Sequence, residues 1–259
     1  MSHMRIFVFP DRAAMSEAAA RHVARSLTSA IADRGDVRNV AATAASQLDF
    51  QRALVRQPGV DWSSVEVFQL DEYIGLPDDH PAVFRRMLRE NVIDPASLGR
   101  VHLLELDAGA DPDAVRARMN RVLAERPLDL AVLGIGENAH LAFNDPPADF
   151  DTTDPYIVVA LDHVCRSQQV GEGWFPTLED VPSKAVTMSI RQMLSAREVV
   201  VIVPDQRKAA AVKATFESPT DPNVPASILR THAHVTLYLD EAAASAVDPG
   251  MLQTYLRLP

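Results

Sequence analysis

Residues 134–147, with the sequence GIGENAHLAFNDPP, gather the side chains of this chain that are best suited to acid and base chemistry. His140 and Asp145 are five residues apart, and Asn138 and Asn144 stand beside them. A carboxylate within reach of an imidazole can orient the ring and support proton transfer. The glycines indicate a dinucleotide loop only weakly, because the third glycine of that motif is missing. The segment therefore predicts an acid/base pair of His140 and Asp145.

Two carboxylates and a phenol follow the apolar run at residues 65–70, in the order Asp71, Glu72, Tyr73. Consecutive strand residues face opposite ways, so we expect at most one of the carboxylates to face a pocket. The other is expected to make a structural hydrogen bond. Taken alone, such a pair at a strand end is more often a solvated turn than a catalytic group.

Small and hydroxyl-bearing residues follow the run at residues 37–42, in the order Thr43, Ala44, Ala45, Ser46, Gln47. If a helix starts there, its unpaired backbone N–H groups could bind an anion. An ordinary N-cap at Ser46 is the alternative, and the missing glycines favour it. Arg166 and Lys208 are cations that could complete an anion site, although a surface charge is the commoner role of either.

Short β-rich runs alternate along the chain with segments of helical periodicity. The runs are residues 5–9, 37–42, 65–70, 128–134, 185–190, 197–203 and 234–240, and residues 11–34 carry an amphipathic helical pattern. This alternation predicts an α/β fold, a Rossmann-like open, mostly parallel sheet with helices on both faces. Ligands of such sheets bind beyond the carboxyl ends of the strands, where the three polar clusters stand.

The composition is that of a globular protein, with 47% hydrophobic and 23% charged residues in a chain of 259. No linker or internal repeat divides it, so we expect one domain over residues 1–259. Residues 1–3 are interpreted as derived from an expression vector. Prolines predict surface loops at residues 146–155 and 217–225.

The net charge of −10, without a basic run, argues against nucleic acid and an anionic membrane as partners. No apolar run approaches the ~18 residues of a membrane span, and no signal-peptide pattern opens the chain, so a cytoplasmic location is expected. Cys165 is the single cysteine, which excludes an internal disulfide. With no Cys or His ligand set near it in the sequence, no structural metal is predicted.

The order of these features over residues 5–245 resembles the glucosamine-6-phosphate deaminase/isomerase family, which shares its fold with the 6-phosphogluconolactonases. Residues 43–47 resemble the family's phosphate loop, LDEY at 70–73 its carboxylate motif, and GIGENAHLAFNDP its GxGxxGHxAFNEP signature. VPSKAVTMSI at 181–190 and the region of Lys208 fall where the family places them. The AFN portion distinguishes the chain from the lactonases, whose histidine motif continues differently.

The resemblance implies conversion of glucosamine 6-phosphate to fructose 6-phosphate and ammonia in amino-sugar catabolism, without cofactor or metal. Asp71 would move a proton between C2 and C1, and His140, oriented by Asp145, would open the pyranose ring. Asn138 would stand beside that histidine. The substrate-binding set implied by the resemblance is Thr43, Ala44, Ala45, Ser46, Gln47, Glu72, Tyr73, Gly136, Ala139, Asn144, Arg166 and Lys208. Within that set, Lys208, Arg166 and the backbone of residues 45–47 would hold the phosphate, and Asn144 would hold the loop or a sugar hydroxyl.

Four positions depart from the family's pattern. Asn138 stands where many members carry an acidic residue, and an amide can orient an imidazole but cannot stabilise its charged form as a carboxylate does. Asp145 replaces the more usual glutamate. Ala44 and Ala139 stand where glycine is common, and a Cβ is costly there if φ is positive or a ligand must approach closely. A changed pocket, a slower enzyme and a protein that binds without turnover therefore all stay open.

Two alternatives to the deaminase remain: hydrolysis of 6-phosphogluconolactone by a histidine-activated water, and non-catalytic sensing of a sugar phosphate. The sensor is favoured only by the two alanines and Asn138. The choice between gluco and galacto substrates depends on pocket shape and is not given by the sequence. The oligomeric state is not given either, so a monomer and a homo-oligomer are both open.

After Asp145 the chain continues as PPADFDTTDPYIVV, without basic residues. The allosterically regulated members of the family use such residues for the phosphate of their activator. We therefore predict that N-acetylglucosamine 6-phosphate does not activate this protein. Steady-state kinetics with and without that sugar phosphate test this, and activation through a second site would contradict it.

Overall fold

The computed structural model describes residues 4–255, so the vector-derived interpretation of residues 1–3 falls outside it. Its strands are β1 (Arg5–Phe9), β2 (Val37–Ala41), β3 (Val65–Gln69), β4 (Asp71–Tyr73), β5 (Arg100–His102), β6 (Leu130–Leu133), β7 (Tyr156–Ala160), β8 (Lys184–Met188), β9 (Glu198–Val203) and β10 (Val235–Asp240). Its α-helices are α1 (Arg12–Arg34), α2 (Leu48–Val55), α3 (Phe84–Leu88), α4 (Asp94–Ala96), α5 (Pro112–Glu125), α6 (His163–Gly171), α7 (Ile190–Met193), α8 (Ala209–Glu217), α9 (Glu241–Ala244) and α10 (Pro249–Tyr255). Tighter or wider helical turns are η1 (Trp62–Ser64), η2 (Arg89–Ile93), η3 (Gln206–Lys208) and η4 (Pro225–Thr231). Within residues 4–255, no helix has the length and apolar character needed to cross a membrane.

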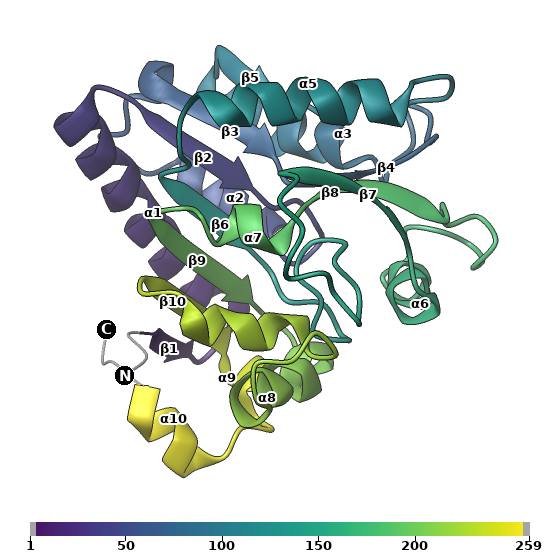
Figure 1. Ribbon diagram of the computed structural model, residues 1–259. Helices are drawn as coiled ribbons and strands as arrows, with labels where there is room; N and C mark the ends of the chain where they lie inside the picture. Colours follow the sequence, from purple (N-terminus) through teal and green to yellow (C-terminus); the bar gives the residue numbers. More distant parts are fainter. Residues whose placement is uncertain (1–3, 256–259) are drawn as a thin grey trace.

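Seven strands form one sheet in the order β1-β10-β9-β6-β2-β3-β5, with every neighbouring pair parallel (Figure 1). From β2 the chain proceeds outward to β3 and β5, and it then returns to place β6 on the other side of β2. The strand order therefore reverses between β2 and β6. Open α/β sheets bind their ligands at the carboxyl ends of the strands at such a reversal.

Helices cover both faces of the parallel sheet, which confirms the predicted fold class. The side chains of the inner strand β9 alternate between the faces, as the geometry of a strand requires. Val199, Val201 and Val203 belong to a cluster that includes residues of α5, α7 and α8. Val200 and Ile202 belong to a cluster with residues of α1 and α2. This continuous apolar run is typical of a parallel strand that is buried on both faces.

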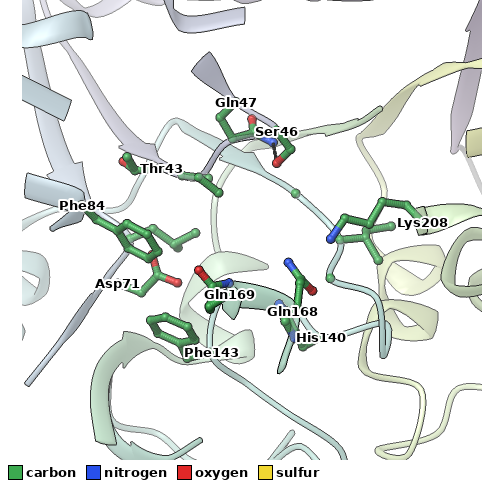
Figure 2. Close-up of a pocket in the computed structure, with 17 residues that line it drawn as sticks. Thr43, Ser46, Gln47, Asp71, Phe84, His140, Phe143, Gln168, Gln169 and Lys208 are labelled. Carbon is green, nitrogen blue, oxygen red and sulfur yellow. Dashed lines mark hydrogen bonds between the residues drawn. The ribbon is translucent and has the colours of Figure 1, made fainter. Parts of the chain in front are cut away.

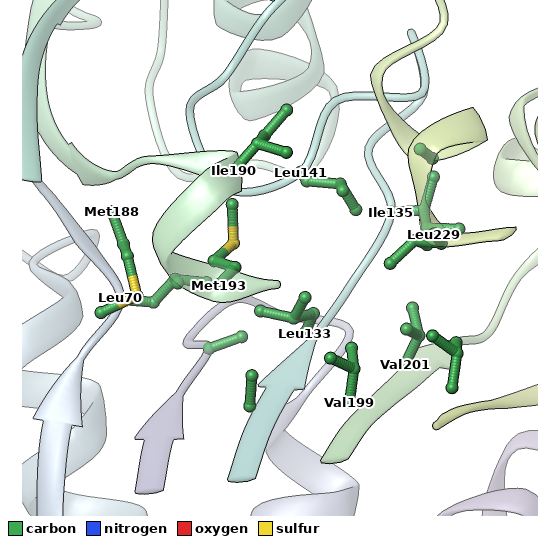
Figure 3. Close-up of a cluster of buried hydrophobic side chains, with 14 of the residues drawn as sticks. Leu70, Leu133, Ile135, Leu141, Met188, Ile190, Met193, Val199, Val201 and Leu229 are labelled. Atoms are coloured by element: carbon green, nitrogen blue, oxygen red, sulfur yellow. The ribbon is translucent and has the colours of Figure 1, made fainter. Parts of the chain in front are cut away.

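The cluster that contains Val199, Val201 and Val203 includes side chains of α7 as well as of the sheet. Figure 3 shows Ile190 and Met193 of α7 over Leu133, Val199 and Val201 of the sheet. All five side chains are fully buried. The loops that leave the carboxyl ends of β6 and β9 therefore start from a rigid base.

The predicted strand at residues 185–190 needs correction, because it does not join the parallel sheet. It forms β8, which lies between β4 and β7 in a separate antiparallel three-stranded sheet. Leu70 is where the chain passes from β3 to β4, and its carbonyl accepts a hydrogen bond from the Met188 N–H at 2.9 Å. An apolar pattern specifies burial and not the direction of pairing, so the sequence does not predict the second sheet. The strands β4, β5 and β7 also have no counterpart in the prediction.

The long helix predicted from residues 11–34 is α1. Asp11 caps it by accepting from the Ala14 N–H at 2.8 Å, and Gly35 ends it with a left-handed φ of 85°. The predicted loop at residues 146–155 has no helix or strand. The predicted loop at 217–225 is bounded by the last residue of α8 and the first of η4.

Candidate active site

A pocket opens at the carboxyl ends of β2, β3, β6 and β9, beside the reversal of strand order. Its lining comprises Ala42, Thr43, Ala44, Ser46, Gln47, Leu70, Asp71, Phe84, Gly134, Ile135, Gly136, His140, Ala142, Phe143, Gln168, Gln169 and Lys208. Figure 2 shows Asp71, Phe84 and Phe143 on one side of it and Lys208 on the other. The segments that form it are far apart in the sequence, and the parallel sheet brings them to one edge.

Half of the residues predicted for the site line this pocket and half do not. The lining includes Thr43, Ala44, Ser46, Gln47, Asp71, Gly136, His140 and Lys208. It does not include Ala45, Glu72, Tyr73, Asn138, Ala139, Asn144, Asp145 or Arg166. The prediction omitted the side chains of Phe84, Phe143, Gln168 and Gln169. No strand-end position marks these four, because α3, the loop after His140 and α6 bring them to the pocket.

Asp71 is the buried carboxylate of the pocket. The residue is 6% exposed, and the Gln69 amide donates to its backbone carbonyl at 2.9 Å. Burial, together with the neighbouring Glu72 carboxylate, raises the pKa of Asp71 well above its ordinary value. A carboxyl group with a raised pKa is a stronger base when ionised, and it can return the proton at neutral pH.

Glu72 does not line the pocket, although the resemblance places it in the substrate-binding set, and this fits the alternation of side chains along β4. Its carboxylate accepts from the backbone N–H groups of Tyr73, Phe84 and Arg85 at 2.8–3.2 Å and from the Gln69 amide at 3.0 Å. Burial raises the pKa of Glu72 to about 6, although these donors oppose the shift. Glu72 thus secures β4 and the start of α3 behind Asp71.

Tyr73 likewise lies outside the pocket lining. Its ring packs among Phe84, Phe143 and Phe175 with centroid distances of 5.0–5.8 Å. Phe84 and Phe143 line the pocket on their other side. Tyr73 therefore supports the aromatic wall of the pocket.

His140 and Asp145 form the pair that the sequence predicts. The imidazole Nδ1 lies 3.0 Å from Asp145 Oδ1, and the imidazole lines the pocket while the carboxylate lies behind it. Burial tends to raise the pKa of Asp145, but His140 and the donors from Asp162 and Asn138 outweigh it, so the pKa is lowered. Asp145 therefore stays ionised and can orient the ring.

Asn138 acts through Asp145 rather than on the imidazole ring. Its side-chain amide donates to Asp145 Oδ1 and to Asp162 Oδ2, each at 3.2 Å. Its side-chain oxygen accepts from the His140 backbone N–H at 3.1 Å. An acidic residue at this position could not donate to these two carboxylates, so the amide fits its surroundings.

Gly136 packs directly against His140. A Cβ built on Gly136 would lie 2.1 Å from the imidazole Nε2, a distance that real Cβ atoms do not show. The position therefore requires glycine for close approach. Asn144 holds the same loop, because its amide donates to the carbonyls of Leu141 and Met188 at 2.8 and 2.9 Å.

Lys208 is the cation in the pocket lining. It is 4% exposed, and its Nζ lies 4.0 Å from Glu172 Oε1. Burial lowers the pKa of Lys208, against the opposing influence of the Glu172 and Glu137 carboxylates. Contrary to the prediction, Arg166 does not share this place, because its guanidinium donates to the carbonyls of Leu178 and Val181 at 2.5 and 3.0 Å.

The loop between β2 and α2 has free donors on the side of the pocket near Lys208. Among the residues that the structure describes, the backbone N–H groups of Ala44, Ala45 and Ser46 donate no hydrogen bond. The predicted N-cap at Ser46 does not form, since Gln47 precedes the helix and its side chain does not cap it. Free N–H groups at a helix start beside a lysine suit a phosphate.

A possible metal-binding group involves Cys165, which the fold brings close to residues that are distant in the sequence. One donor atom each from His140, Asp145 and Cys165 lie within 4.8 Å of one another. Burial, with Asp145 and Asp162 nearby, raises the pKa of the Cys165 thiol, and only a thiolate is a good metal ligand. With its thiol protonated, Cys165 is a poor ligand, so these three residues are poorly suited to holding a metal ion.

Comparison with known proteins identifies the family. Residues 10–238 match the family described as glucosamine-6-phosphate isomerases/6-phosphogluconolactonase. The chain belongs to this family.

Relatives within the family include glucosamine-6-phosphate deaminases. One from Streptococcus suis is 36% identical over 204 residues, covering 79% of this chain and 85% of its own. Another, from Exiguobacterium sp., is 38% identical over 196 residues, covering 74% of each chain.

Solved structures of the family share the fold. A monomeric glucosamine-6-phosphate deaminase of the NagB superfamily has a TM-score of 0.84 and 27% identity, covering 94% of this chain and all of its own. A 6-phosphogluconolactonase from Trypanosoma brucei has a TM-score of 0.78 at 17% identity, covering 96% of this chain and all of its own. The second likeness supports the family fold alone.

The two alanines at positions where the family commonly has glycine differ in backbone conformation. Ala139 is left-handed with φ of 66°, whereas Ala44 is not among the positive-φ residues of the described chain. The left-handed region costs a non-glycine residue about 1 kcal/mol. We expect Ala139→Gly to raise the free energy of unfolding by about 0.5–1 kcal/mol, and Ala44→Gly to lower it by a similar amount. Urea unfolding of both variants tests this, and equal destabilisation by the two would contradict it.

Proposed function

We propose that this protein converts glucosamine 6-phosphate and water to fructose 6-phosphate and ammonia. One observation carries the proposal: Asp71 and His140, which Asp145 holds from behind, line the same pocket as Lys208 and the loop whose N–H groups at residues 44–46 are free. Two acid/base groups and an anion site therefore share one pocket, with Asp71 across from Lys208. The deaminases among the relatives support the same activity.

In this proposal the phosphate binds to Lys208 and to the backbone N–H groups of residues 44–46. The sugar extends across the pocket toward Asp71. His140, held by Asp145, moves the proton between the anomeric hydroxyl and the ring oxygen, and the pyranose opens to an aldehyde.

Asp71 then takes the proton from C2 and returns it to C1. As the C2–H bond breaks, its electron pair forms the C1–C2 double bond and the aldehyde oxygen gains a proton, which gives an enolamine. When C1 is then protonated, C2 becomes an imine carbon and C1 becomes the hydroxymethyl carbon. Water adds to that imine, and ammonia leaves as the C2 ketone forms. None of these steps transfers hydride.

Lactone hydrolysis is the second candidate, because His140 could instead activate a water molecule. The likeness to solved lactonases is below 25% identity and supports only the fold. A sugar-phosphate sensor is the third candidate. The left-handed backbone of Ala139 is the one feature that favours a sensor.

One pair of assays distinguishes the three functions. Purified protein is incubated with glucosamine 6-phosphate while ammonia and fructose 6-phosphate are measured, and then with 6-phosphogluconolactone while acid release is measured. We expect equimolar ammonia and fructose 6-phosphate. Lactone hydrolysis without deamination would refute the proposal, and tight binding without either reaction would support the sensor.

A further inference from the structure

Gln169 is a buried amide in the pocket without a partner. The residue is 5% exposed and lines the pocket, yet its side chain makes no hydrogen bond to any residue in the described range 4–255. The amide oxygen and nitrogen of Gln169 are not among the fully covered polar atoms that lack a partner, so they stay accessible from the pocket. An amide that is unpaired within the protein gains a hydrogen bond when a ligand or water reaches it. Native proteins keep such a group mainly where a ligand or water completes it.

The preceding residue, Gln168, shows the contrast. Its side-chain oxygen accepts from the Glu137 backbone N–H at 3.0 Å, and its amide donates to Glu172 Oε1 at 2.8 Å. Glu172 is the carboxylate 4.0 Å from Lys208. Both polar ends of the Gln168 amide are thus bonded within the protein, on the side of the pocket near Lys208. The Gln169 amide is free to contact a ligand.

The position of Gln169 indicates which part of a ligand it meets. Figure 2 shows Gln169 on the side of the pocket where Asp71 and Phe143 lie, away from Lys208. If the phosphate binds at Lys208, the opposite side receives the carbon atoms that react at Asp71. Gln169 therefore faces the C1–C2 end of the sugar.

We propose that Gln169 is a specificity-determining residue whose carbonyl oxygen accepts a hydrogen bond from the 2-amino group of the substrate. The inference rests on the proposed function. An amide oxygen accepts from an ammonium group more strongly than from a hydroxyl, because the bond is charge-assisted. Such a contact favours 2-amino sugar phosphates over their 2-hydroxy counterparts at the point where Asp71 acts.

Calorimetric binding of two open-chain ligands tests this without requiring turnover. The ligands are 2-amino-2-deoxyglucitol 6-phosphate and glucitol 6-phosphate, which differ only at C2, and inorganic phosphate serves as a probe of the Lys208 side. We expect Gln169→Leu to raise the Kd of the amino ligand by about 10- to 100-fold and the Kd of the hydroxy ligand by much less. Binding of inorganic phosphate should be unchanged. The preference that remains is expected to come from the Asp71 carboxylate.

Thermal unfolding separates this role from a structural one. Leucine replaces an unpaired amide in Gln169→Leu, so the unfolding temperature should stay the same or rise. The matched control is Gln168→Leu, which loses two hydrogen bonds near Lys208. We expect that variant to unfold at a lower temperature and to bind both sugar ligands and inorganic phosphate more weakly, by similar factors.

Two outcomes would overturn the inference in distinguishable ways. If wild-type protein prefers the amino ligand and Gln169→Leu keeps the same ratio of the two Kd values, Gln169 does not accept a hydrogen bond from the amino group. If folded wild-type protein binds neither sugar ligand, the proposed function itself fails. A fall in unfolding temperature with Gln169→Leu would instead assign the amide a structural role and would also overturn the inference.

Discussion

Replacing Asp71 by asparagine is expected to lower kcat for deamination by roughly 100- to 10,000-fold, the usual contribution of a positioned acid/base group. Asparagine keeps the shape of the side chain but cannot take the proton from C2. Lys208 and residues 44–46 lie across the pocket, so inhibition by inorganic phosphate should be retained. Measured turnover near the wild-type rate would remove Asp71 from the mechanism.

The pH dependence gives a second readout of the same substitution. Asp71 must be ionised to act as a base, so its raised pKa should place the acid limb of kcat/KM well above 3.8, the ordinary pKa of an aspartate. Residual activity of Asp71→Asn should lack that limb.

Although Asp71→Asn is expected to lower activity, it should raise the free energy of unfolding at neutral pH. The folded state holds the Asp71 proton more tightly than the unfolded chain, because the folded pKa is raised. The favourable contribution is thus complete below the ordinary pKa and is lost as pH rises through the folded value. Asp71→Asn removes this loss, so at neutral pH the variant should resist urea better than wild-type protein. Equal urea midpoints at all pH values would contradict the raised pKa.

Gly136→Ala should have the second large effect. The added Cβ would lie 2.1–2.3 Å from three atoms of the His140 ring, so the imidazole must move away from Asp145. We expect kcat to fall by roughly 100-fold or more, through loss of the oriented acid/base group. The free energy of unfolding should fall by about 1–3 kcal/mol from overpacking.

Gly99→Ala is the matched control, because a Cβ there meets no atom within 4 Å and the backbone does not need positive φ. Steady-state kinetics and urea unfolding of both variants test the prediction. Gly99→Ala should match wild-type protein in kcat. If Gly136→Ala does so as well, His140 does not need its present position for turnover.

Much of the site could be predicted because parallel strands place their carboxyl ends at one edge. Asp71, His140 and Lys208 each follow an apolar run, so the fold class alone brings them together. The alternation of side chains along β4 also explains why Asp71 lines the pocket while Glu72 binds backbone N–H groups behind it. These are consequences of local sequence and chain direction.

The remainder depended on packing that no local pattern specifies. Gln168, Gln169 and Arg166 lie on the same short helix α6, yet two line the pocket and the third donates to carbonyls elsewhere. Which helix face meets the pocket depends on how α6 packs against the rest of the chain, and a sequence period cannot supply that rotation.

The sequence by itself therefore determined the parallel α/β sheet, the edge where the site lies, and the His140–Asp145 pair. Those features depend on apolar periodicity and on residues close together in the chain. Only the tertiary structure decided that β8 pairs antiparallel with β4 and β7, that Arg166 turns away, and that Gln169 enters the pocket unpaired. These features depend on contacts between segments that are distant in the sequence. The packing of the whole chain sets the geometry of those contacts.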